Sequence, residues 1–124
     1  MVYELRREET GIWSILKSGE VLETFEPNQK ERAQERFREL MKLAESVWLK
    51  EGWRVSKKGN ENKNWDRFHV VVFKKNDKWT GILTDNITGQ SVNAKREYPT
   101  SEEVKIAAFY AAISWEEKLN QKDE

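Results

Sequence analysis

Apolar residues recur at helical spacing in the segment from Asn28 to about Lys50. They stand three or four positions apart, at Ala33, Phe37, Leu40, Met41, Ala44, Val47 and Trp48. Asn28 follows Pro27 and belongs to the residue types that cap the start of a helix. The pattern therefore predicts an amphipathic helix over this segment, with a charged face opposite its apolar stripe.

Short runs of β-branched and aromatic residues on both sides of this helix predict strands. The runs are residues 3–7, 12–16 and 20–25 before the helix, and 53–55, 68–75, 78–84 and 90–98 after it. Gly19 in the first turn and the pair Asn76 and Asp77 in a later one are typical of tight hairpin connections. Residues 56–67 are polar and offer almost nothing to a core, so we expect a flexible surface loop there.

A second helix is predicted after Pro99. Residues 100–103, Thr-Ser-Glu-Glu, match a capping box, and the helix should run to about Leu119, followed by a frayed tail over 119–124. This helix is apolar on more than one side, since a second stripe of Ile106, Phe109, Tyr110 and Ile113 lies beside the first. Two explanations fit this excess: burial between the sheet and the first helix, or an interface with another subunit.

These elements predict an α+β fold, with antiparallel β-meanders and two α-helices packed on one face. The order is β-β(-β)-α-β-β-β-α, and 124 residues suit a single domain spanning 1–124. The alternation of meander and helix resembles the order in single-stranded nucleic-acid-binding folds of the Whirly and PUR type. That resemblance implies a nucleic-acid-binding function.

The composition argues against catalysis. The chain has no cysteine and one histidine, His69, and it lacks both glycine-rich phosphate-binding motifs. No nucleophile, base and orienting group can be assembled from such a set, so we expect no catalytic residues, no metal site and no cofactor. The first residues show no signal-peptide pattern and no segment has the length of a membrane span, so we expect a cytoplasmic protein without membrane contact.

Charge is distributed unevenly along the chain. The 22 basic and 22 acidic residues cancel overall, but residues 50–96 contain eleven basic and five acidic residues. A basic centre of this kind attracts anionic partners, and interspersed aromatic side chains can stack on bases. We therefore predict a binding surface for single-stranded DNA or RNA that comprises Lys57, Lys58, Lys63, Trp65, Arg67, Lys74, Lys75 and Lys78. In this hypothesis Trp65 stacks on a base and the cations neutralise phosphates.

Two other interpretations compete with nucleic-acid binding. Tryptophans in a small α+β domain usually belong to the core, and lysines on edge strands often prevent aggregation. Alternatively, the protein is an interaction or assembly module, a homodimer or a partner adaptor, whose anchors are Ile106, Phe109, Tyr110 and Ile113 of the last helix.

Overall fold

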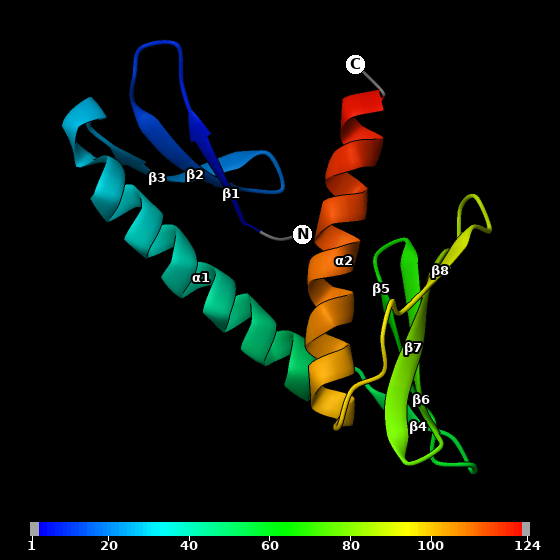
Figure 1. The fold of residues 1–124 in the computed structure, drawn as a ribbon. Helices are drawn as coiled ribbons and strands as arrows, with labels where there is room; N and C mark the ends of the chain where they lie inside the picture. Colours follow the sequence, from blue (N-terminus) through cyan, green and yellow to red (C-terminus); the bar gives the residue numbers. More distant parts are fainter. Residues whose placement is uncertain (1–2, 123–124) are drawn as a thin grey trace. The chain divides into compact units, whose positions relative to one another are not determined.

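The computed structural model describes residues 3–122 and shows an α+β fold with two antiparallel sheets and two long helices (Figure 1). The order of strands and helices agrees with the order expected from the sequence. Contacts divide the chain into two compact units, residues 1–47 and residues 48–124. The strands belong to two sheets, one in each unit, and a single domain over the whole chain stays a prediction.

The first unit begins with a three-stranded meander. Its strands are β1 (Tyr3–Arg7), β2 (Trp13–Lys17) and β3 (Glu20–Phe25), in the order β1-β2-β3. The β2–β3 turn has positive φ angles at Ser18 and Gly19, which agrees with the expected tight hairpin. A register shift between Ile15 and Leu16 breaks the alternation of the strand, so that these neighbouring residues are both buried.

The first helix starts differently from the expectation. A short 3-10 turn, η1 (Pro27–Gln29), precedes α1 (Lys30–Lys50), and Asn28 lies inside that turn rather than at the cap. The cap is Glu26, whose backbone N–H donates to Gln29 Oε1 at 2.9 Å. Farther along α1, Arg36 Nε donates to both carboxylate oxygens of Glu23 in β3 at 3.1 Å. This ion pair links the helix to the sheet of the first unit.

The second unit contains a five-stranded sheet with the order β4-β5-β6-β7-β8, in which all neighbours are antiparallel. The strands are β4 (Arg54–Val55), β5 (Glu61–Trp65), β6 (Phe68–Lys75), β7 (Lys78–Asp85) and β8 (Ser91–Asn93). The long helix α2 (Ser101–Lys122) runs along this sheet and contacts β6 and β7 (Figure 1). The last strand is shorter than the predicted segment 90–98, although Tyr98 still pairs with Trp79.

The prediction of a flexible loop over residues 56–67 is wrong at residues 61–65, because these form strand β5, while residues 56–60 form the turn between β4 and β5. Lys63 and Trp65 alternate with Asn62 and Asn64, so one face of the strand turns toward the core and the other stays polar. Backbone pairing with β6 satisfies the strand's polar groups. The sequence analysis missed this strand because residues 61–65 have low hydrophobicity: the buried position 63 is occupied by a lysine.

The second helix begins as predicted and ends later. Thr100 Oγ1 accepts a hydrogen bond from the backbone N–H of Glu103 at 3.3 Å, which confirms Thr100 as the cap. The helix continues to Lys122, so the tail expected from residue 119 is wrong over 119–122, and residues 123–124 lie outside the described part of the chain. Neither α1 nor α2 has, within the residues described, the length and apolar character needed to cross a membrane.

Candidate nucleic-acid interface

The two faces of the five-stranded sheet differ in their side chains. In an antiparallel pair, residues opposite each other project from the same face. The register places Phe68, Val70, Val72 and Leu83 on the face beneath α2, where all four are buried. We call the opposite surface the outer face.

The outer face carries polar, aromatic and basic side chains. By register they are Arg54, Asn62, Asn64, His69, Val71, Phe73, Lys75, Lys78, Thr80, Ile82, Thr84, Ser91 and Asn93. None of these strand residues is acidic. Within residues 48–122, α2 packs on the inner face, and no helix of this unit lies on the outer one.

The two acidic residues of these strands, Glu61 and Asp85, lie on the inner face and are paired there. Lys105 Nζ of α2 contacts Glu61 Oε1 at 2.5 Å. Arg67 donates two hydrogen bonds to Asp85, Nε to Oδ1 at 2.9 Å and Nη2 to Oδ2 at 2.7 Å. These hydrogen bonds hold the pKa of the fully buried Asp85 carboxyl below its usual value. The outer face therefore has no neighbouring strand carboxylate to oppose an anion.

Arg67 is thus a structural residue, contrary to the prediction that it contacts phosphate. Its guanidinium is held in place by the bidentate pair with Asp85. Asp85 also accepts a hydrogen bond from the backbone N–H of Ile87 at 2.9 Å and one from Thr88 Oγ1 at 3.1 Å. The carboxylate therefore fixes both the arginine and the turn after β7.

Trp65 belongs to an aromatic cluster rather than to a stacking surface. Its ring lies 4.9 Å from that of Trp48 and 5.5 Å from that of Phe109, measured between centroids. Trp48 also contacts Trp53, at 5.4 Å, and Phe109, at 5.7 Å. The predicted role of Trp65 as a base-stacking residue is wrong because its ring packs against other aromatic side chains.

Lys63 enters the same cluster and does not reach the surface. Its side chain is buried, with 8% of the residue exposed, and Nζ donates to the backbone carbonyl of Trp48 at 2.9 Å. The ammonium lies 4.3 Å from the centre of the Trp48 ring, and Trp53 Nε1 donates to the same carbonyl at 2.7 Å. Burial lowers the pKa of Lys63. Lys63 caps the end of α1 and cannot serve as a phosphate contact.

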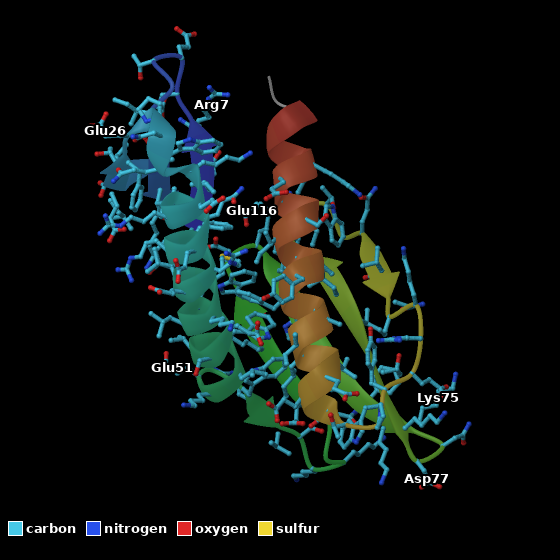
Figure 2. The ribbon with its side chains drawn as sticks, turned by 60° about the vertical axis from the view of Figure 1, so that its left-hand side comes forward. Arg7, Glu26, Glu51, Lys75, Asp77 and Glu116 are labelled. Atoms are coloured by element: carbon cyan, nitrogen blue, oxygen red, sulfur yellow. The ribbon has the colours of Figure 1, made fainter. Side chains whose placement is uncertain are left out.

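The other five predicted cations are exposed and lie around two turns. Lys57 and Lys58 occupy the β4–β5 turn, while Lys74, Lys75 and Lys78 flank the β6–β7 hairpin. Both turns lie at the same end of the sheet, because the start of β5 pairs with β6 near its hairpin end. Figure 2 shows Lys75 and Asp77 at this end. We call these five lysines the basic end.

The sequence analysis assigned only Lys75 and Lys78 of the outer face to the binding site, and three of the residues that it did not assign carry a cation or an aromatic ring. They are Arg54, His69 and Phe73. The strict alternation of β6, in which positions 68, 70 and 72 are buried and 69, 71 and 73 are half-buried, is the signal that could have identified the last two. His69 Nδ1 lies 2.7 Å from Asn64 Oδ1 across the strand pair.

One of the four residues predicted to form an interaction surface on the last helix is buried in the core. Phe109 is 1% exposed and packs against Trp48 and Trp65, so it cannot anchor a partner. Ile106 and Ile113 are half-buried, whereas Tyr110 is 45% exposed. The interaction-module alternative therefore depends on Ile106, Tyr110 and Ile113.

Comparison of this chain with protein-family models, with curated proteins and with solved structures finds no match. The resemblance in element order to Whirly and PUR folds gains no support from these comparisons. The arrangement of the outer face and the basic end is therefore the basis on which a function can be argued.

Proposed function

We propose that this protein binds single-stranded nucleic acid on the outer face of its five-stranded sheet. The observation that carries the proposal is the absence of acidic strand residues from that face, combined with the basic end beside it. Lys75 and Lys78 lie opposite each other on the outer face itself. A cationic border next to an open sheet is suited to a polyanion whose backbone follows the border.

The centre of the outer face supplies groups that bases can contact. Phe73 and His69 offer flat rings for stacking, which contributes about 1–3 kcal/mol per base. Asn62, Thr80 and Asn93 carry amide and hydroxyl groups that can pair with base edges. With five strands about 4.8 Å apart, the face is roughly 19 Å wide. This width suits a few nucleotides of a single strand.

The experiment is a fluorescence-anisotropy titration with a labelled oligothymidylate of about ten nucleotides, at several salt concentrations. The variant Lys75→Glu/Lys78→Glu should bind at least about tenfold more weakly and show a salt slope lower by about one to two charges. The control Lys17→Glu/Lys42→Glu makes the same charge change at exposed positions of the first unit and should bind like the wild type. Equal weakening by both pairs would refute a role for the outer face.

A further inference from the structure

A groove of about 640 Å³ lies between α2 and the strands β7 and β8. Val70 and Leu83 of the sheet, Val92 of β8 and the alanines 107, 108 and 111 of α2 provide most of its apolar lining. Its size falls within the range of pockets that hold small molecules. Val70, Leu83 and Val92 line the groove from the inner face, whereas Ile82 and Asn93, which also line it, belong by register to the outer face.

Close packing at two points sets the ends of this groove. At the start of α2, a Cβ on Gly81 would lie 2.9 Å from Val104 Cγ1, so the absence of a side chain at Gly81 allows helix and sheet to approach. Farther along, the rings of Phe68 and Trp115 meet at 5.4 Å. Between these contacts the residues of α2 that line the groove, three alanines and Ser114, all have small side chains. The space that they leave is elongated along the helix.

The charge of the lining is one-sided. Among the residues that the structure describes, the charged residues of the lining are Lys95 and Lys118, and none is Asp or Glu. Within residues 3–122, neither lysine takes part in an ion pair. An apolar groove with unopposed cations favours a ligand that combines an apolar body with an anionic group.

The two lysines lie at opposite ends. Ala94, the residue before Lys95, donates its N–H to Gly81 O at 2.9 Å, which places Lys95 near the start of α2. Lys118 lies beyond Trp115, one turn after Ser114 on the same side of the helix.

Gln90 lies at the Lys118 end of the groove. Its carbonyl accepts a hydrogen bond from the N–H of Asp85, and Asp85 pairs with Phe68, whose ring contacts Trp115 near that end. The Lys118 end therefore combines an ammonium with a hydroxyl and an amide group, all of which can donate to a carboxylate.

We propose that the groove binds an amphipathic monocarboxylate with an extended apolar chain. The carboxylate lies at Lys118, with Ser114 and Gln90 beside it, and the chain extends over the alanines toward Val104. This inference does not depend on nucleic-acid binding. It rests on the dimensions of the groove, its apolar lining and the two lysines of that lining, which form no ion pair within residues 3–122.

The test is calorimetric titration of the full chain with decanoate below its micelle-forming concentration, and with decanol as the uncharged analogue. We expect decanoate to bind with a dissociation constant below about 1 mM, and Lys118→Glu to weaken it at least about tenfold. Lys42→Glu, at an exposed position that does not line the groove, should leave the affinity unchanged. Ala111→Phe should block the groove, while Glu117→Phe, at an exposed site of α2 outside it, should not.

Each outcome decides one part of the inference. No binding of decanoate to the wild type overturns it. Equal binding of decanol, or unchanged binding in Lys118→Glu, removes the requirement for a carboxylate. A larger loss in Lys95→Glu than in Lys118→Glu reverses the proposed orientation. Equal losses in Ala111→Phe and Glu117→Phe show that the groove is not the site.

Discussion

The Arg67 guanidinium and the Asp85 carboxylate form a bidentate pair, with hydrogen bonds of 2.9 and 2.7 Å. The sequence predicts Arg67 as a phosphate ligand because it lies in a basic segment. In the structure its pair with Asp85 stabilises the end of the sheet instead. The carboxylate also binds the turn that follows β7, through Ile87 and Thr88. A single buried charge thus organises two segments, and its removal should affect folding more than binding.

Replacement of Asp85 by Asn should lower the free energy of unfolding, because Arg67 loses its charged partner. The pKa of Asp85 is lowered in the folded state, so its stabilising effect is complete above the unfolded pKa. The effect should disappear as the pH falls below about 4 toward the lower folded pKa. Urea unfolding of both proteins between neutral and acidic pH measures this. The exposed control Asp77→Asn should remain close to the wild type, and equal stability of Asp85→Asn at neutral pH would contradict the account.

Lys63 should make stability rise with pH on the alkaline side. Burial lowers its folded pKa, so the unfolded chain binds more protons between that pKa and the unfolded value of about 10.4. The contribution of Lys63 to the free energy of unfolding therefore increases with pH between these two pKa values. In Lys63→Met this increment should be missing from denaturant unfolding curves measured at successive pH values. An identical pH dependence in both proteins would show that the ammonium is not desolvated.

The aromatic cluster around Trp48 should be a main source of stability for the second unit. Phe109→Ala removes a buried ring that contacts two tryptophans and should cost about 3–5 kcal/mol. Ile87→Ala, at an exposed position, should cost less than about 0.5 kcal/mol. Chemical denaturation monitored by tryptophan fluorescence compares the two. A small loss in Phe109→Ala would mean that the cluster does not support the fold.

Phe73 should contribute to nucleic-acid binding without dominating the fold, since it is half-buried on the outer face. Phe73→Leu keeps an apolar side chain but removes the ring, and should weaken oligothymidylate binding by about 1–3 kcal/mol with an unchanged salt slope. Val71→Leu, a neighbour on the same face, serves as the control and should bind normally. An anisotropy titration in which the two variants behave alike would exclude stacking on Phe73.

Elements with strong periodicity could be predicted from the sequence. The hairpin strands, both helices and the Thr100 cap follow from apolar spacing and capping residues, and the structure confirms them. The positive φ of Gly19 likewise follows from its place in the turn. These features depend on neighbours close in sequence, which is why a single chain reveals them.

The errors in the predicted binding site involve partners distant in sequence. Lys63 looks like a surface cation because its sequence neighbours are polar, but it reaches the carbonyl of Trp48, fifteen residues earlier. Arg67 likewise looks like a surface cation, but it donates to the carboxylate of Asp85, eighteen residues later. Local composition therefore overestimates the exposed positive charge of residues 56–67. Five of the eight predicted binding residues remain on the surface, and the outer face brings Lys75 and Lys78 together with Phe73.

The most direct test of nucleic-acid binding on the outer face is a titration of the wild-type protein with labelled oligothymidylate at about 50 mM and 200 mM salt. We expect saturable binding that weakens steeply between the two concentrations, because phosphate contacts by the basic end release counterions. The absence of binding at the lower salt concentration, or binding of equal strength at both, would contradict the proposal.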